Sequence, residues 1–224
     1  MLTKLNAMRR GIAATRGYAA RSMQTPAAGS ATPMHDCALR ARLRAATADL
    51  HAQVDGLFPR GLDSVAAYHR YVLGMHRFAI DYEIAVDAAP RHSSWLVRDL
   101  VALSLPPMVA LGVRRPVAGQ AARLGWDYVM AGSGMGARAL VRDAHRLGFD
   151  GRRGACFLER HAAGDDWATV RMRMRAFDAS DAGRLAQAEA GACAAFALVR
   201  ACFERSFEAL PTAPPTRIRV ESRP

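Results

Sequence analysis

The sequence predicts a single all-α domain, and three observations support this fold class. With 224 residues, the chain is long enough to bury one sizeable hydrophobic core. Hydrophobic residues make up 51% and charged residues 23%, a balance that excludes a mainly disordered chain. Apolar residues recur at three- and four-residue intervals along most of the chain, which is the period of an amphipathic helix. No alternating apolar and polar run lies between hairpin turns, so no strand is predicted.

The two ends of the chain have a different composition from its middle. Residues 1–35 form a predicted flexible basic leader, since its first 34 residues hold five Lys or Arg and no acidic residue. Such a leader resembles an organelle transit peptide, but the chain is rich in Ala and Arg throughout, and we favour an extended bacterial start. Residues 211–224 form a predicted Pro-rich flexible tail. The helical domain is therefore expected over residues 36–210.

The first two predicted helices span residues 39–57 and 65–86. Helical spacing in the first is shown by Leu39, Leu43, Ala46, Leu50, Val54 and Leu57. Residues 61–64 supply capping side chains before the second helix. The apolar and aromatic positions of that second helix are Tyr68, Tyr71, Val72, Met75, Phe78, Ile80 and Tyr82.

Four more helices are predicted in the second half of the domain. They cover residues 94–105, 118–145, 167–177 and 181–210. The last has an apolar face made by Leu185, Ala188, Ala192, Phe196, Val199, Phe203 and Leu210. Together these segments predict a helical bundle.

The sequence argues against a membrane span and against a metal–cysteine site. The longest uncharged apolar stretch, residues 100–113, contains two prolines and is shorter than the ~18–20 residues that a spanning helix needs. The four cysteines lack a C-x-x-C pair or a zinc-ligand spacing. We therefore expect a cytoplasmic protein without a disulfide framework.

The pI of 10.6 raises nucleic acid as a partner. The most basic run, residues 170–177, alternates Arg with apolar residues. On a helix Arg171 and Arg175 share a face while Arg173 points elsewhere, so the run does not form one basic stripe. No recognition helix or interleaved aromatic residues accompany it. An ordinary solvated face explains the run better, and no nucleic-acid partner is expected.

A histidine in the first helix has neighbours suited to metal chemistry. Arg44, Thr47, His51 and Asp55 fall on one side of that helix. A neutral imidazole can ligate a metal through one nitrogen while the other donates to a carboxylate, and Asp55 is placed for this at i+4. Arg44 could meet an anionic group of a large ligand. A lone histidine beside a core is more often structural, so this pattern alone is weak.

A glycine cluster, Gly132-Ser133-Gly134-Met135-Gly136, interrupts a long helical pattern. Each glycine in a helix interior costs about 1 kcal/mol relative to alanine, so the cluster favours close approach of something flat or bulky. A loop between two helices and a helix crossing through small residues are the alternatives. A phosphate loop is excluded, because no Gly-Lys-Ser/Thr follows and no strand precedes.

Taken together, the two segments resemble the heme oxygenases that produce biliverdin. Residues 43–55, Leu-Arg-Ala-Ala-Thr-Ala-Asp-Leu-His-Ala-Gln-Val-Asp, are similar to the proximal helix of that family. Residues 128–137, Tyr-Val-Met-Ala-Gly-Ser-Gly-Met-Gly-Ala, resemble its kinked distal helix in the bacterial Gly-Ser-x-x-Gly form, including that of enzymes associated with bacteriophytochromes. Either motif alone is unspecific, whereas both in this order are fairly specific.

The resemblance implies a role for each matching residue. It makes His51 the proximal iron ligand and Asp55 its acidic partner, and it makes Gly132 and Gly136 the points where the distal helix approaches the macrocycle. The other implied heme contacts are Arg44 and Arg171 at the propionates, Thr47, Tyr128, and Phe196 in the pocket wall.

Two positions depart from the family pattern. Ala48 stands where some members carry a second basic residue. Ser133 stands where the animal enzymes have an aspartate that orders distal water, although bacterial members resemble this chain at that position. The catalytic distal segment is thus expected at Gly132, Ser133 and Gly136, with the water-ordering group left open.

The activity implied by the resemblance is oxidative cleavage of heme to biliverdin, CO and free iron. Heme is then both substrate and cofactor, O2 is the co-substrate, and a reductase or ferredoxin supplies electrons. A phytochrome could accept the biliverdin. The alternatives are a non-catalytic heme-binding or carrier protein on the same fold and, less favoured, a helical regulator that binds nucleic acid.

Overall fold

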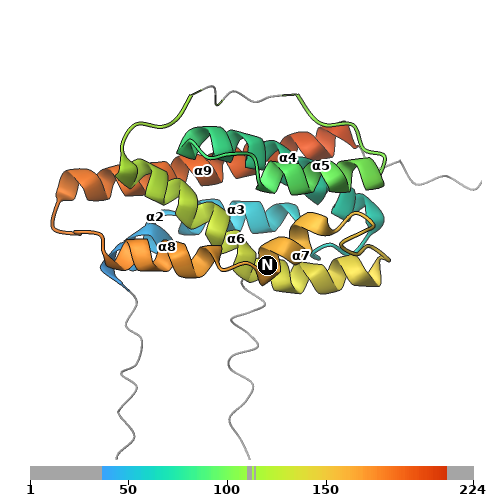
Figure 1. Cartoon of the computed structure of the whole chain (residues 1–224), viewed down its shortest axis with the longest axis horizontal. Helices are drawn as coiled ribbons and strands as arrows, with labels where there is room; N and C mark the ends of the chain where they lie inside the picture. Colours follow the sequence, from blue (N-terminus) through green and yellow to red (C-terminus); the bar gives the residue numbers. More distant parts are fainter. Residues whose placement is uncertain (1–36, 110–112, 114, 211–224) are drawn as a thin grey trace, which may run out of the picture.

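The computed structural model describes residues 37–109, 113 and 115–210. The predicted leader, residues 1–35, and the predicted tail, residues 211–224, lie outside the described residues. Within the described part all regular structure is helical (Figure 1). The helices are α2 (Ala38–Ala46), α3 (Ala48–Leu57), α4 (Val65–Val86), α5 (His92–Ala102), α6 (Gln120–Arg146), α7 (Cys156–Ala163), α8 (Asp166–Arg175) and α9 (Ala182–Ala209).

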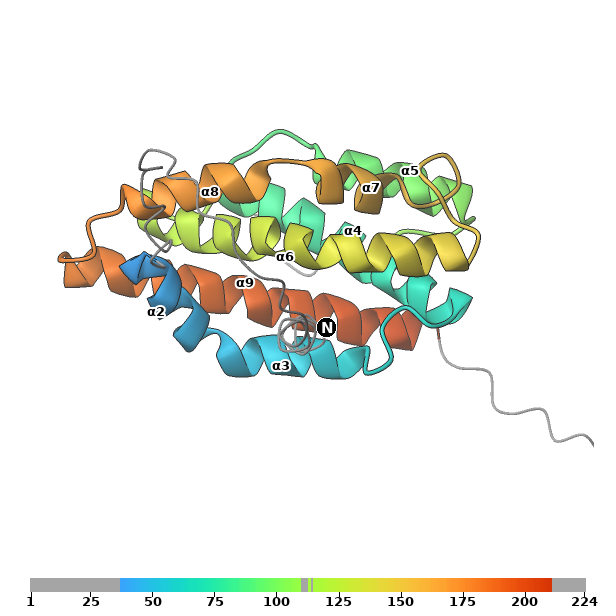
Figure 2. The ribbon, with the colours of Figure 1, turned by 90° about the horizontal axis from the view of Figure 1, so that it is seen from below.

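Helix α9 is the centre of the bundle. It packs against α6, α4, α3 and α2, and Figure 2 shows it between α2 and α3 on one side and α6 on the other. Helices α7 and α8 pack on α6, and α5 packs on α4 and α7. The proximal and distal segments of the sequence analysis, on α3 and α6, thus share α9 as a neighbour.

Helices α6 and α9 cross at two glycines. A Cβ added at Gly125 would overlap the carbonyl oxygen of Ala188, and a Cβ added at Gly191 would overlap the carbonyl oxygen of Ala122. The two backbones are therefore in direct contact, which only residues without a side chain permit. This crossing fixes α6 on α9.

The predicted helix over residues 39–57 is two helices that meet at Thr47. The Thr47 side chain is 2% exposed, and its Oγ1 donates to the carbonyl of Leu43 at 2.7 Å. Its backbone departs from helical geometry, with φ −106° and ψ 4°. A threonine hydroxyl that bonds to the carbonyl four residues earlier bends a helix. The direction of the chain changes between α2 and α3 (Figure 2).

The other predicted helices agree closely with the observed ones. Helix α4 has the predicted bounds, and its N-terminus is capped by Ser64, whose Oγ accepts from the amide of Ala67 at 3.2 Å. Asp181 caps α9 in the same way, accepting from the amide of Arg184 at 3.0 Å. Helix α5 begins two residues before the predicted start and ends three residues early.

Helix α7 was not predicted. Its N-terminus has no local side-chain cap. Instead the carboxylate of Asp99 on α5 accepts from the amides of Cys156, at 2.7 Å, and Phe157, at 2.9 Å. Because the cap comes from a distant helix, the sequence around residue 156 carries no start signal.

Helix α9 is the one helix in the described part of the chain that is long and apolar enough to cross a membrane by length and composition. A core helix of a bundle meets the same criterion, and α9 buries Ala188, Ala192, Phe196 and Val199 among its neighbours. Burial accounts for part of its apolar character, since 33% of its most apolar 18-residue window is buried in the described structure. All four cysteines are free thiols.

Candidate functional site

His51 lies in the middle of α3 with a carboxylate on one of its ring nitrogens. Its Nδ1 is 3.2 Å from Oδ2 of Asp55, and the two side chains are 30% and 20% exposed. The i+4 spacing predicted this pair. A carboxylate at Nδ1 fixes the ring and leaves Nε2 as the nitrogen that can ligate a metal.

Phe196 contacts the His51 ring from α9. The ring centroids are 5.5 Å apart at an interplanar angle of 58°, and Phe196 is buried. The residue predicted in the pocket wall therefore lies beside the predicted iron ligand. The Phe196 ring therefore places an apolar group directly against the imidazole of His51.

The glycine cluster is part of one unbroken helix, so the loop alternative is wrong. Helix α6 runs through Gly132, Gly134 and Gly136. In the part of the chain that the structure describes, a Cβ added at Gly136 would meet no atom within 4 Å, and one added at Gly132 would meet only the Trp167 side chain, at 3.8 Å. The tight crossing with α9 lies at Gly125 instead. Because Gly132 and Gly136 have no side chains, the backbone of α6 is bare on one face at these positions. The kink expected in this segment stays a prediction.

Ser133 is engaged with the neighbouring helix α7. Its Oγ is 2.7 Å from the Met130 carbonyl, to which it donates, and 2.8 Å from Nε2 of His161. A hydroxyl has one hydrogen, so the His161 Nε2–H donates to Ser133. Gly134 faces the same way, because an added Cβ would lie 3.3 Å from the His161 carbonyl oxygen.

The remaining predicted heme contacts are spread over three helices. Tyr128 lies one turn before Gly132 on α6, with its ring 6.0 Å from that of Trp167. Arg44 is exposed in the last turn of α2, and Arg171 is partly buried on α8. Thr47 is buried and its hydroxyl bonds to the Leu43 carbonyl, so its observed role is at the junction of α2 and α3.

Arg173 is exposed, as the predicted solvated face requires, and it also forms an ion pair with the neighbouring helix α6. Its guanidinium pairs with the carboxylate of Asp127 on α6, and the Tyr82 hydroxyl donates to the same carboxylate at 2.8 Å. Burial, followed by the charge of Asp127, raises the pKa of Tyr82. The basic run of α8 thus helps to attach α8 to α6.

Two surface hollows, of about 490 and 470 Å³, lie away from His51 and the bare face of α6. The first is lined by Asp150, Gly151, Arg152, Cys156, Glu159 and Arg160. The second is lined by Tyr82, Val86, Ala88, Gln120, Arg123, Asp127 and Arg173. Neither includes a residue that the sequence predicted to contact heme.

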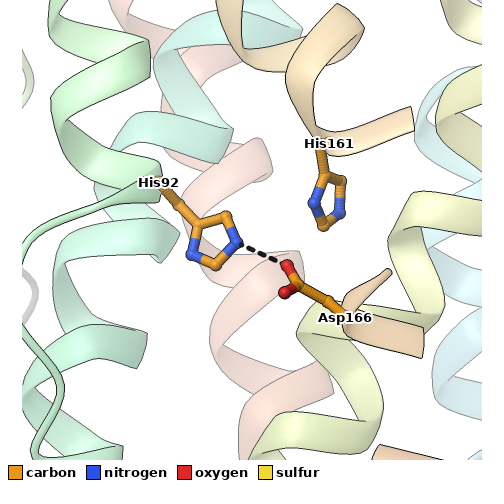
Figure 3. Close-up of side chains that lie close together, drawn as sticks. All are labelled: His92, His161 and Asp166. Carbon is orange, nitrogen blue, oxygen red and sulfur yellow. Dashed lines mark hydrogen bonds and ion pairs between the residues drawn. The ribbon is translucent and has the colours of Figure 1, made fainter. Parts of the chain in front are cut away.

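A second group of candidate metal-ligating side chains was not predicted from the sequence. His92 of α5, His161 of α7 and Asp166 of α8 lie together, with ligand atoms within 4.8 Å of one another (Figure 3). His92 Nε2 is 3.3 Å from Oδ2 of Asp166. No sequence spacing indicates this group, because three helices bring it together and one of them was not predicted.

Both imidazoles in this group are neutral near pH 7. Burial, followed by the charge of His92, lowers the pKa of His161 to about 4. Burial, followed by the charge of Arg91, lowers the pKa of His92. Burial opposes ionisation of Asp166, but the hydrogen bond and charge of Arg91 outweigh it and lower the Asp166 pKa. The group therefore combines two imidazoles with a carboxylate.

The described helices form a heme oxygenase-like fold, as comparison with solved structures shows. One matching structure is that of the NO- and CO-bound heme oxygenase from Neisseria meningitidis, with a TM-score of 0.61 and 26% sequence identity. The match covers 80% of this chain and 97% of that one. No family model matches the sequence, and no curated protein matches it significantly. The predicted fold class is confirmed, and the roles of the site residues stay predictions.

Proposed function

We propose that this protein binds heme at His51 and cleaves it to biliverdin, CO and free iron. The observation that carries the proposal is the combination of His51, with Asp55 on its Nδ1, and a distal helix whose face at Gly132 and Gly136 is bare. The heme oxygenase-like fold supports it, since the matching protein is a heme oxygenase.

The residues present fit a heme. Its macrocycle is flat and largely apolar, and a flat group can approach a helix backbone only where side chains are missing. A Cβ at Gly136 would occupy space that no atom of the described chain fills. On the other side, the partly exposed imidazole of His51 lies against the apolar ring of Phe196.

The chain's own residues would bind and orient the ligand. His51 would ligate through Nε2 while Asp55 accepts the Nδ1 proton, which holds the ring in one tautomer and one orientation. Arg44 and Arg171 would pair with the propionates through charge-assisted hydrogen bonds. Bound heme would supply the iron chemistry that activates O2.

The distal segment would act through its backbone. Gly132 and Gly136 allow the helix to approach the ligand closely, which excludes bulk water from that face. The Ser133 hydroxyl donates to the Met130 carbonyl and accepts from His161, so it would hold α6 in register with α7. Tyr128, one turn earlier on α6, would border the same site.

Electrons would come from a separate reductase or ferredoxin, and a phytochrome would accept the biliverdin. We also propose a cytoplasmic location, which the four free thiols support, because reducing compartments keep cysteines unpaired.

Hemin titration of the purified protein tests the proposal. We expect a shifted Soret band with one heme per chain, followed by loss of that band and appearance of biliverdin when O2 and a reductase-coupled donor are supplied. Persistent heme without bilin would support a carrier function instead. No Soret shift at all would overturn both.

The iron ligand is tested with a matched pair of variants. His51→Ala should abolish the proximal nitrogen signature in the iron spectrum. His145→Ala removes a histidine that also pairs with a carboxylate, since its Nε2 is 2.8 Å from Glu159, and this variant should leave the spectrum unchanged. An unchanged spectrum in His51→Ala would show that another residue ligates the iron.

A further inference from the structure

Two ring nitrogens and a carboxylate oxygen converge between α5, α7 and α8 (Figure 3). The His161 Nε2–H donates to Ser133, which leaves a lone pair on Nδ1. This Nδ1 is buried and has no hydrogen-bond partner among the described residues, and His161 as a whole is 5% exposed. An acceptor buried without a partner is rare and costly, so this lone pair is available to a group bound between the helices.

His92 presents a second lone pair to the same place. The Arg91 guanidinium lies 2.9 Å from His92 Nε2 and donates to it, so the His92 proton is on Nδ1. The same Arg91 nitrogen donates to Oδ2 of Asp166 at 2.6 Å. The lone pairs of His92 and Asp166 are therefore both directed at a single cationic group.

We propose that His92, His161 and Asp166 bind one divalent transition-metal ion, with Zn²⁺ as the best-suited ion, at a site separate from His51. Two imidazoles and one carboxylate are a common donor set for such ions. Both imidazoles carry the free lone pair that a metal requires. The separation of 3.3 Å between His92 Nε2 and Asp166 Oδ2 equals the roughly 3.3 Å expected between two ligands of a tetrahedral ion with bonds of about 2.0 Å.

His161 is held through the ring nitrogen that does not face the metal, and the corresponding nitrogen of His92 faces a carboxylate. His161 Nε2 is fixed by Ser133 on α6. His92 Nδ1 lies 3.7 Å from Oε1 of Glu83, and that carboxylate also accepts the backbone amides of His92, at 2.6 Å, and Ser93, at 3.1 Å. Metal-ligating histidines almost always have a hydrogen-bond partner on the second ring nitrogen, and Ser133 is such a partner for His161.

Closing the site requires a small movement. The largest separation between ligand atoms, 4.8 Å, has to shrink by about 1.5 Å to reach tetrahedral spacing. The short link between α7 and α8 is exposed at Gly164 and Asp165. This link can move without disturbing the core.

Arg91 competes with the metal for the same lone pairs. Its side chain is 50% exposed and also lies over the Trp95 ring, 5.4 Å from the centroid. It can therefore turn into solvent without leaving a buried charge. Removing the Arg91 side chain should therefore raise the affinity of the site for the metal, because the metal no longer has to displace a hydrogen-bonded cation.

The test uses the full chain, free of heme and stripped with a chelator. Isothermal titration with Zn²⁺ should show one ion per chain. Co²⁺ should give an absorption spectrum of nitrogen and oxygen ligands without thiolate charge-transfer bands, which excludes the cysteines. With Zn²⁺ at 100 times its Kd, the melting temperature should rise by roughly 5–10 °C.

Variants identify the ligands. Asp166→Asn and His161→Ala should weaken Zn²⁺ binding by at least about 100-fold, because even loss of a partner behind a ligand costs 10–100-fold. Arg91→Ala should tighten it by about tenfold, and His51→Ala and His145→Ala should leave it unchanged. Asp166→Asn should fold, because Asp166 is partly exposed and Asn has the same shape as Asp. The ligand test therefore stays valid even if His161→Ala fails to fold.

Two results would overturn the site. One is the absence of binding in both the wild type and Arg91→Ala. The other is undiminished binding in Asp166→Asn. Neither result bears on heme, because His51 lies outside this group and the titration uses heme-free protein.

Discussion

Replacing Gly136 by alanine should make the heme-free protein more stable and bind heme less well. An added Cβ at Gly136 would meet no atom within 4 Å, so the substitution meets no steric barrier in the described chain. The residue lies inside α6, where alanine is favoured over glycine by about 1 kcal/mol. The free energy of unfolding should rise by about that amount. The same methyl group would stand where the macrocycle is proposed to approach the helix.

The assay combines two measurements on one variant. Urea unfolding of heme-free Gly136→Ala should give a higher midpoint with an unchanged m-value, which reports stability alone. Hemin titration should give an affinity at least tenfold lower, corresponding to about 1.4 kcal/mol. A rise in stability together with a fall in hemin affinity indicates a glycine that faces the ligand, whereas a glycine needed for packing would lose stability when replaced.

Gly125→Ala is the matched control, being the same substitution in the same helix. Its Cβ would overlap the carbonyl oxygen of Ala188 and crowd the amide of Ala192 on α9. Overpacking costs about 1–3 kcal/mol or more and outweighs the gain in helix propensity, so this variant should be less stable. The reasoning is refuted if Gly136→Ala is destabilised like the control, or if its hemin affinity equals that of the wild type.

Three further predictions concern buried carboxylates. Asp99→Ala should lower the free energy of unfolding by about 2–4 kcal/mol in urea, because two buried amides at the start of α7 lose their acceptor. Burial raises the pKa of Asp99 from 3.8 to about 6. Between pH 4 and 6 the native state therefore keeps a proton on Asp99 that the unfolded state has lost. The free energy of unfolding of the wild type, relative to that of Asp99→Asn, should fall by about 1.4 kcal/mol per pH unit as the pH rises over this range. A difference between the two proteins that does not change with pH would contradict this prediction. Arg77 pairs with Asp81 at 3.0 Å, with both side chains buried. Arg77→Met should lower the free energy of unfolding by about 3–5 kcal/mol, because it leaves the Asp81 charge buried and unpaired. The double variant with Asp81→Leu should lose clearly less, because no unpaired charge remains. Equal losses of stability in the single and double variants, measured by thermal or urea unfolding, would contradict this prediction.

Most of the fold could be predicted because its signals are local. The bounds of α4 follow from the spacing of its apolar residues and from Ser64, whose cap lies three residues from its partner. Helix α7 could not be predicted, because Asp99 supplies its cap from 57 residues away. A helix of eight residues also shows too little periodicity to stand out.

The same distinction applies to the candidate sites. His51 and Asp55 are one helical turn apart, so the sequence alone places them together. His92, His161 and Asp166 meet only after three helices have packed. Thr47 adds a feature that the motif did not indicate, since its hydroxyl bonds to the Leu43 carbonyl at the junction of α2 and α3; its predicted heme contact stays a prediction.

The two sides of the proposed heme site differ in how firmly they are held. Helix α6 is anchored on α9 at Gly125 and on α7 by the bond between Ser133 and His161. Helix α3 has no fully buried residue and is bounded by non-helical residues at Thr47 and Phe58. A ligand that enters between these helices would contact a firmly held helix, α6, on one side and a less firmly held helix, α3, on the other. Any shift that fits the site to the thickness of the ligand would therefore be made by α3, which would move about its two ends together with His51.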